Sequence, residues 1–417
     1  MQRFANLLDR VLGRGRNQEV LSTTFNLNQI RQLPCTDDDP KPHARSGHRI
    51  FTDDDYIYVI GGYDVEPSDG GFIFKELWRY NLLTKCWSQV SLLPGQRFPQ
   101  ALASHAIAPV IPLSPYIICY GGSQIPFGET NSNSVFLVSA LRNGISSIEL
   151  NQKSPRLTGI YGHAMCSSQI EDNVFYVVGG TTGHDYFCDV HKLTLAADHS
   201  CEWEQLNMGS SRPGRYRLEV AHDEINNRLL LLGGGSPDFA EGFDQITVFN
   251  LSTNLFETVT TKPDGDEFPT RRRSHSLVKH GRFLVMAGGC APAIEHQPFP
   301  LVIRGDIWRL DLDTLQWTQL GSLLPPVFFH DATVTSDGMM LIWGGVTSAD
   351  SSTRTAEGQY MWLAPPTLKT LAAHQLAKHY PGIFCRNVEG PRITNMKEIW
   401  NHLSNHVFDV DPSEAAC

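Results

Sequence analysis

Six short runs of apolar residues recur along the chain, and each run ends in two adjacent glycines. A buried strand followed by a glycine pair suits a tight connection between strands, because glycine adopts positive φ and lets two backbones approach closely. An even repeat of this kind predicts one recurring unit rather than several unrelated domains. The pairs are spaced 54 to 60 residues apart: Gly61-Gly62, Gly121-Gly122, Gly179-Gly180, Gly233-Gly234, Gly288-Gly289 and Gly344-Gly345.

Two further marks flank these glycine pairs. A histidine precedes the pair in five units (His48, His105, His163, His275 and His330), and the fourth unit has Leu218 at this place. After the pair come a strand, a polar turn and an aromatic residue that opens the next strand, as at Trp87, Trp203, Phe256 and Trp317, with Ile148 in the second unit. Runs of this kind, separated by turns, predict several β-strands per unit.

The sixth unit lacks its last strand, because Pro365 and Pro366 follow the apolar residues 360–363. Residues 30–33, ahead of the first unit, have the spacing of an outer strand, so we expect them to complete the last unit. Closure of this kind leaves no free sheet edge. The order of marks over residues 25 to 363 resembles the kelch repeat. The resemblance implies an all-β fold: a six-bladed kelch β-propeller closed by an N-terminal strand, with a short C-terminal α-helical tail.

The chain then divides into three parts: a flexible or amphipathic segment (1–22), the propeller (23–364) and the helical tail (365–417). In the tail, residues 367–380 read as a helix, with Thr367 as N-cap and Pro381-Gly382 as its stop. A second helix is expected over residues 395–407. One interpretation is that both helices only dock on the propeller.

The other interpretation rests on spacing. Thr367-Leu368, Ala372 and Leu376 resemble the BC box that binds elongin, with Ala372 where cysteine is usual, and residues 380–383 resemble a cullin-2 box. Further segments of the propeller add to this resemblance: 44–49, 75–80, 125–129, 179–183 and 305–308. Together they are similar to kelch-repeat substrate receptors of cullin-2 ubiquitin ligases.

This resemblance implies a set of partners. Elongin C and elongin B would bind Thr367, Leu368, Leu371, Ala372 and Leu376, and cullin-2 would bind Tyr380, Pro381 and Ile383. Substrates would carry C-terminal degrons that end in glycine, and a phosphatase of stress-kinase signalling is a further implied partner. The location would be cytoplasmic and nuclear.

The segments around the repeated histidine place cations and aromatics at one end of the propeller, where ligands usually bind. Arginine suits a terminal carboxylate because its planar fork donates two hydrogen bonds. We expect Arg215, Arg217, Arg272, Arg273 and Ser274 to hold the carboxylate. Aromatic walls (Tyr161, Tyr216, Phe328 or Phe329) would exclude a side chain on the last residue. The predicted degron site is Arg45, Ser46, His48, Ser104, His105, Tyr161, His163, Arg215, Tyr216, Arg217, Arg272, Arg273, Ser274, His275, Phe329 and His330.

A structural interpretation stands beside this one. A histidine at a fixed repeat position often bonds a neighbouring backbone, an arginine in a repeat can bridge blades, and the run 271–273 can be a solvated loop.

Composition narrows the function further. A net charge of −10 disfavours nucleic acid as a partner, and no apolar run approaches the length that spans a membrane. The nine cysteines form no CxxC pair, which fits reduced thiols and argues against zinc. No HExxH, G-x-S-x-G or P-loop motif is present, so we predict neither an enzyme nor a cofactor. The alternative to a ligase receptor is a kelch scaffold or adaptor.

Overall fold

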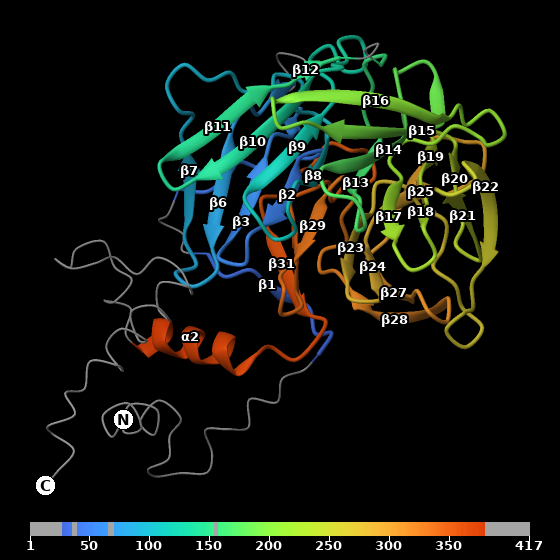
Figure 1. Cartoon of the computed structure of the whole chain (residues 1–417). Coiled ribbons are helices and arrows are strands. Elements are labelled where there is room, and N and C mark those ends of the chain that lie inside the picture. The colour runs from blue at the N-terminus through green and yellow to red at the C-terminus, as the bar shows by residue number, and fades with distance from the viewer. Residues whose placement is uncertain (1–26, 36–39, 66–70, 154–156, 380–417) are drawn as a thin grey trace, which may run out of the picture.

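The computed structural model describes residues 27–35, 40–65, 71–153 and 157–379. It confirms the predicted propeller: six sheets, each built on four antiparallel strands, follow one another around a common axis (Figure 1). The expected helix over residues 395–407, the segment 1–22 and the cullin-2-box-like residues Tyr380, Pro381 and Ile383 lie outside the described residues.

The strands of the first three blades run outward from the axis in chain order. Blade 1 consists of β2 (Arg49–Thr52), β3 (Tyr56–Ile60), β6 (Leu77–Asn81) and β7 (Trp87–Val90). Blade 2 consists of β8 (Ala106–Pro109), β9 (Tyr116–Tyr120), β10 (Val135–Leu141) and β11 (Gly144–Glu149). Blade 3 consists of β13 (Ala164–Ser167), β14 (Val174–Thr181), β15 (Tyr186–Leu195) and β16 (Ser200–Asn207), and β12 (Asn151–Gln152) adds a parallel strand to its outer edge.

The other three blades repeat this plan. Blade 4 consists of β17 (Glu219–Asp223), β18 (Arg228–Leu232), β21 (Gln245–Asn250) and β22 (Leu255–Thr260). Blade 5 consists of β23 (Ser276–His280), β24 (Phe283–Ala287), β27 (Asp306–Asp311) and β28 (Gln316–Ser322). Blade 6 consists of β29 (Asp331–Val334), β30 (Met339–Trp343), β31 (Gly358–Trp362) and β1 (Arg31–Gln32).

Three short hairpins extend the second and third strands of blades 1, 4 and 5. They are β4 (Tyr63–Asp64) with β5 (Phe72–Ile73), β19 (Gly235–Ser236) with β20 (Phe239–Ala240), and β25 (Cys290–Pro292) with β26 (Leu301–Ile303). Each follows a glycine pair, so the hairpins stand at the same end of the propeller as these pairs.

The ring closes where the sequence predicted. Strand β1 pairs antiparallel with β31, and Arg31 lies opposite Tyr360. The N–H of Leu33 donates to the carbonyl of Gly358 at 2.7 Å, which extends the pairing by one bond. The outer edge of blade 6 is therefore covered by the first described segment of the chain.

The glycine pairs join neighbouring blades. The N–H of the second glycine in each pair donates to a carbonyl of the next blade, at N···O distances of 2.8–3.0 Å in all six cases. At Gly122, whose φ is +94°, a Cβ would lie 1.9 Å from the carbonyl oxygen of Ala101. Glycine is required there because any side chain would collide with the backbone.

The core is distributed between blades rather than gathered at one centre. Six apolar clusters each join the facing sheets of two neighbouring blades. In the cluster between blades 6 and 1, Trp87 packs against Trp343 with ring centroids 5.8 Å apart. Both faces of each blade are covered in this way, which explains the strongly apolar inner strands.

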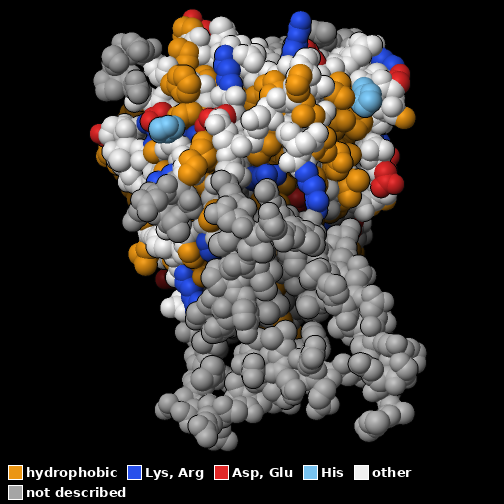
Figure 2. Space-filling model, turned by 90° about the vertical axis from the view of Figure 1, so that its left-hand side faces the viewer, with side chains coloured by type: hydrophobic (Ala, Val, Ile, Leu, Met, Phe, Trp, Pro, Cys, Tyr) orange, Lys and Arg blue, Asp and Glu red, His pale blue; other side chains and the backbone are white. Residues whose placement is uncertain are grey.

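The tail helix α2 (Leu368–His379) lies beside blades 1 and 6, at the end of the propeller opposite the glycine pairs (Figure 1). Thr367 caps it, since the Thr367 hydroxyl accepts from the N–H of Thr370 at 3.2 Å. Among the described helical residues, none forms a helix long and apolar enough to cross a membrane. On the side of the propeller drawn in Figure 2, basic side chains are scattered among apolar and neutral ones rather than joined in one patch.

Candidate ligand-binding site at the end of the channel

The segments that precede the innermost strands form a closed ring of backbone hydrogen bonds. In each blade, the residue before the recurrent histidine or Leu218 is left-handed, with φ between 55° and 64°. Its N–H donates to the carbonyl of the equivalent residue in the preceding blade, at N···O distances of 2.6–3.0 Å. These ring residues are Gly47, Ser104, Gly162, Arg217, Ser274 and Phe329.

Arg217 places a guanidinium at the centre of this ring. From blade 4 it donates to the hydroxyl of Ser104 in blade 2, and it lies 4.5 Å from the ring centroid of Phe329 in blade 6. A Cβ on Gly47 in blade 1 would lie 3.2 Å from its Nη2. The Arg217 side chain therefore crosses the opening that the backbone ring leaves.

The electrostatic state of Arg217 favours an anionic ligand. Among the described residues, no carboxylate lies within ion-pair distance of Arg217, and its Nε is buried without a hydrogen-bond partner, as is the hydroxyl of Ser274. Burial and the nearby charge of Arg49 together lower the pKa of Arg217 to about 10, against the attraction of Glu219. The group stays protonated at neutral pH, so a bound carboxylate would supply the anion that a buried cation needs.

Three charged side chains meet next to the ring, at the start of the innermost strands. Arg49 Nη1 lies 2.9 Å from Glu219 Oε1 and 3.3 Å from Asp331 Oδ1, so blades 1, 4 and 6 are linked across the channel. Burial raises the pKa of Glu219 and of Asp331, against the attraction of Arg49. We did not predict this cluster. Its signal in the sequence is a charged residue directly after the repeat position of the histidine, where other blades have alanine or serine.

Three predicted site arginines point into the blades instead of the channel. Arg45 pairs with Glu76 at 2.6 Å, Arg215 with Glu241 at 2.6 Å, and Arg272 with both oxygens of Asp306 at 2.9 and 2.6 Å. Arg45 and Arg272 also donate to the carbonyl of the first glycine in their own blade's pair. These three guanidinium groups already have carboxylate partners, so the structure places them apart from Arg217.

The five predicted histidines are buried between blades. The Nε2 of His48 bonds the carbonyl of Trp343 in blade 6 at 3.0 Å, and a Cβ on Gly121 would lie 2.6 Å from Cε1 of His163. Burial lowers the pKa of His105 and His163 to about 3, and that of His330 to about 4. His48 and His275 are shifted in the same direction by burial, so the pKa of each lies well below its ordinary value.

Aromatic side chains surround the ring on the side of blades 1 to 3. Tyr63 stacks on Phe127 at 5.4 Å, and Phe127 meets the edge of Tyr161 at 4.8 Å. The guanidinium of Arg354 lies 4.8 Å from the Tyr63 ring centroid and donates to the hydroxyl of Ser46. Phe127 is 39% exposed, so this wall is accessible to a ligand.

A second aromatic group continues the wall on the side of blades 3 to 5. Tyr186 and Tyr216 lie 5.4 Å apart, and the guanidinium of Arg273 lies 6.0 Å from the Tyr216 ring centroid. Phe328 is fully buried, while its neighbour Phe329 belongs to the ring. Of the predicted site, the structure brings Ser104, Arg217, Ser274 and Phe329 together, with Tyr161, Tyr216 and Arg273 around them.

The tail places its predicted elongin-binding residues on a helix that is already docked. Ala373 is buried against the propeller and Leu368 is 85% exposed, while Leu371 and Ala372 are half-buried. Thr367 is exposed, and the side chain of Leu376 lies outside the described residues. The docked face therefore includes Ala373 and His374, and Leu368 lies away from it.

Known proteins match most of this chain. A family model described as the KLHDC2/KLHL20/DRC7 Kelch-repeats domain matches residues 105–345, and a Kelch motif model matches residues 44–91. Kelch domain-containing protein 10 of Xenopus tropicalis is 38% identical over 353 residues, which cover 82% of this chain and 80% of that protein. The human protein of the same name is 37% identical over 355 residues, with 82% and 75% covered.

A more distant relative is the kelch domain-containing protein 10 homolog of Drosophila melanogaster. It is 31% identical over 363 residues, which cover 79% of this chain and 56% of that protein. With the six-bladed fold, these matches show that the chain belongs to the kelch-repeat family, in the group of kelch domain-containing protein 10.

Proposed function

We propose that this chain is the substrate-recognition subunit of a cullin-2 RING ubiquitin ligase. In this proposal α2 binds elongin C and, through it, elongin B, while the ring end of the channel binds C-terminal degrons. The chain itself would carry no catalytic centre and no cofactor, and it would act in the cytoplasm and the nucleus. The described residues contain no group of three or more His, Cys, Asp or Glu side chains placed to hold a metal ion.

The exposure of Leu368 is the observation that carries the ligase proposal. A leucine at the start of a helix, 85% exposed although the helix is docked through Ala373, is free to enter an apolar groove on a partner. Thr367 and Leu368 begin the box-like spacing, and the small residue Ala372 stands four positions after Leu368. The Leu368 end of the helix is thus left uncovered by the propeller.

Arg217 supports the degron part of the proposal. Its guanidinium and the hydroxyls of Ser104 and Ser274 are polar groups that suit a carboxylate, and the ring around them is built from backbone. A terminal carboxylate bound there would lie against this backbone ring, so the bound peptide would have to end at that point. A residue with a side chain would meet Phe329 and Tyr216, which favours glycine as the last residue.

A kelch scaffold or adaptor without ligase activity is the second candidate. Ala372, in the place where the box usually has cysteine, favours it, because a smaller side chain fills less of a partner's groove. In that case the propeller would still bind its partner, a phosphatase of stress-kinase signalling being one, and α2 would only pack on the blades.

The test is co-purification of the wild-type chain and a Leu368→Asp variant, probed for elongin B, elongin C and cullin-2. Recovery by the wild type and loss in the variant are the expected results. Ile225→Asp is the matched control, because Ile225 is an apolar residue of blade 4 that is 76% exposed, whereas α2 lies beside blades 1 and 6. If the wild type recovers no elongin, the ligase proposal is wrong and the scaffold remains.

A further inference from the structure

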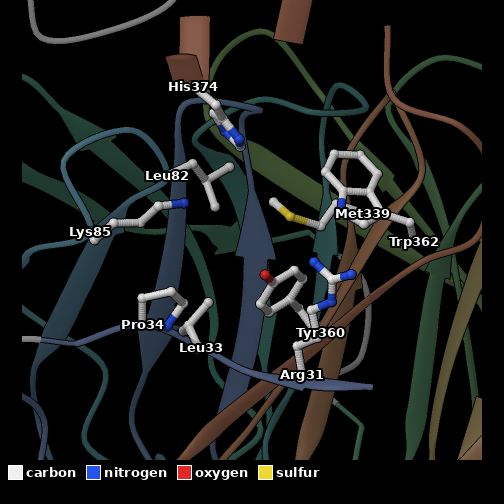
Figure 3. A pocket seen from close by; sticks show the side chains of 9 residues that line it. All are labelled: Arg31, Leu33, Pro34, Leu82, Lys85, Met339, Tyr360, Trp362 and His374. Carbon is white, nitrogen blue, oxygen red and sulfur yellow. The ribbon is translucent and has the colours of Figure 1, made fainter. Parts of the chain in front are cut away.

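A cavity of about 130 Å³ lies where the tail helix meets the propeller, at the end opposite the ring (Figure 3). Three segments far apart in the sequence enclose it: the closing strand β1 and the residues after it, the β6–β7 turn of blade 1, and α2, with blade 6 as a wall. Its lining residues are Arg31, Leu33, Pro34, Leu82, Lys85, Met339, Tyr360, Trp362 and His374.

The polar groups of this cavity are mainly basic. Arg31, Lys85 and His374 come from the three different segments, and Figure 3 shows their nitrogen atoms turned toward the same space. No aspartate or glutamate is among the nine lining residues. Asp337 is the acidic neighbour of His374, and its carboxylate accepts a hydrogen bond from the Thr335 hydroxyl.

Lys85 is the principal cation of this cavity. Its side chain is half-buried, and no hydrogen bond or ion pair to its ammonium group occurs within the part of the chain that the structure describes. Burial lowers the pKa of Lys85 to about 8. Burial and the charge of Lys85 together lower the pKa of His374 to about 4, against the attraction of Asp337. Lys85 is therefore a partly buried cation without a carboxylate partner among the described residues, whereas the His374 ring is neutral at neutral pH.

We propose that this cavity is a binding site for a small oxyanion of the phosphate class. Lys85 would provide the principal charge, Arg31 would close the mouth of the cavity, and the His374 ring would donate one hydrogen bond. Tetrahedral oxyanions match several donors that converge from different directions. A volume of about 130 Å³ holds such an ion, since one water molecule needs roughly 10–15 Å³ by the same measure.

The bound anion would tie three parts of the molecule together. His374 is on α2, Lys85 is on blade 1, and Arg31 is on β1, which pairs with β31 of blade 6. An ion shared by these groups would hold α2 against the propeller at the point where the ring closes. This site does not depend on the ligase role proposed for α2.

The test uses inorganic phosphate and the full chain, at pH 7.5 and at ionic strength held constant with sodium chloride. Calorimetric titration is expected to show one saturable site in the wild type and at least roughly tenfold weaker binding in Lys85→Gln, because a charge-assisted hydrogen bond is lost. Lys192→Gln is the control: Lys192 pairs with Glu171 on blade 3, and this variant is expected to bind phosphate like the wild type. Hydrogen exchange of the α2 amides is expected to slow with phosphate in the wild type and the control, but not in Lys85→Gln.

A second variant, His374→Leu, keeps the test decisive if Lys85→Gln does not fold. It changes the cavity from the side of α2 and is also expected to weaken phosphate binding. The proposal is wrong if the wild type shows no saturable binding, or if a folded variant of Lys85 or His374 binds phosphate as the wild type does. It is equally wrong if phosphate binds without slowing exchange in α2.

Discussion

Arg217 crosses the channel axis from blade 4 and donates a hydrogen bond to the hydroxyl of Ser104 in blade 2. This contact joins two blades that are not neighbours, and it does so without a carboxylate. Most buried arginines of the propeller have a carboxylate partner in their own blade, as Arg45 and Arg272 do. Arg217 differs from them in that its charge is available to a ligand.

Replacing Arg217 by glutamine should weaken ligand binding far more than stability. A peptide with a free C-terminal glycine is expected to bind at least roughly tenfold less tightly, since a hydrogen bond to a charged group is lost. Fluorescence anisotropy with labelled glycine-ended peptides measures this. The same peptides with an amidated C-terminus are the control, because they should bind the wild type as weakly as free-ended peptides bind the variant. Equal affinity of variant and wild type for the free-ended peptide would show that the carboxylate does not reach Arg217.

Replacing Arg272 by glutamine should lower the stability of the fold far more than it weakens ligand binding. Arg272 is fully buried and bonds both oxygens of Asp306, so the change leaves a carboxylate without its cation. The expected loss in the free energy of unfolding is about 3 kcal/mol. Urea denaturation of this variant beside Arg217→Gln makes the comparison. A loss as small as that of Arg217→Gln would mean that the ion pair adds little to the stability of blade 5.

Alanine at Gly122 should prevent normal folding, whereas alanine at Gly281 should not. Both glycines have positive φ, but a Cβ at Gly122 would lie 1.9 Å from the Ala101 carbonyl oxygen, while at Gly281 nothing lies within 4 Å. Gly281→Ala is therefore expected to cost only the backbone strain, about 1 kcal/mol. Soluble yield and thermal unfolding of the two variants distinguish a backbone collision, expected at Gly122, from backbone strain alone, expected at Gly281. Similar behaviour of both variants would contradict the close approach of the Gly122 and Ala101 backbones within blade 2.

Acid should destabilise the propeller through its buried histidines. The pKa of His105 and of His163 is about 3 in the folded protein and 6.5 in its ordinary state, so the unfolded chain takes up protons first as the pH falls. Stability is complete above pH 6.5 and declines as the pH falls toward 3, by about 1.4 kcal/mol per pH unit for each such histidine.

His163→Leu tests this pH dependence, because Leu218 fills the same repeat position in blade 4. Between pH 7.5 and pH 5.0 the variant is expected to lose about 2 kcal/mol less unfolding free energy than the wild type. Urea denaturation at the two pH values measures this loss of unfolding free energy for the variant and for the wild type. An equal loss in variant and wild type would mean that His163 does not control the acid sensitivity.

The sequence predicted the blade plan because each feature of the repeat has a local cause. A glycine pair such as Gly121-Gly122 is needed where one blade approaches the next. The number and spacing of the pairs along the chain therefore indicate the number and length of the blades. The closing strand was predictable for a similar reason, since its spacing matched the strand that the sixth unit lacked. Both inferences needed only the order of residues along the chain.

The roles of the individual arginines could not be assigned from the sequence in the same way. Arg215 and Arg217 are two residues apart, yet one pairs with Glu241 inside its blade and the other lies in the ring. The left-handed backbone at Arg217 separates their directions, and nothing in the side-chain pattern indicates that turn. A recurring acid some distance after Arg45, Arg215 and Arg272 was the available signal for the first group.

The tail helix shows a further limit of sequence reasoning. The sequence analysis offered docking on the propeller as one interpretation without assigning it a face, and the structure buries Ala373 and leaves Leu368 exposed. Small residues pack closely on a flat surface and add little to an apolar pattern, so the docked face was not recognisable. The cavity at His374 depends on the same docking and was not predictable either.

The pairing of β1 with β31 also sets the order of events during synthesis on the ribosome. Arg31 is translated early, but β1 cannot pair until β31, which contains Tyr360, has also been translated, so the last blade cannot form before then. Until then, the growing polypeptide has an open gap with two unpaired strand edges. Because α2 follows β31 directly, the helix emerges only after its docking surface has been translated, so a prematurely terminated product lacks both the finished propeller and the tail.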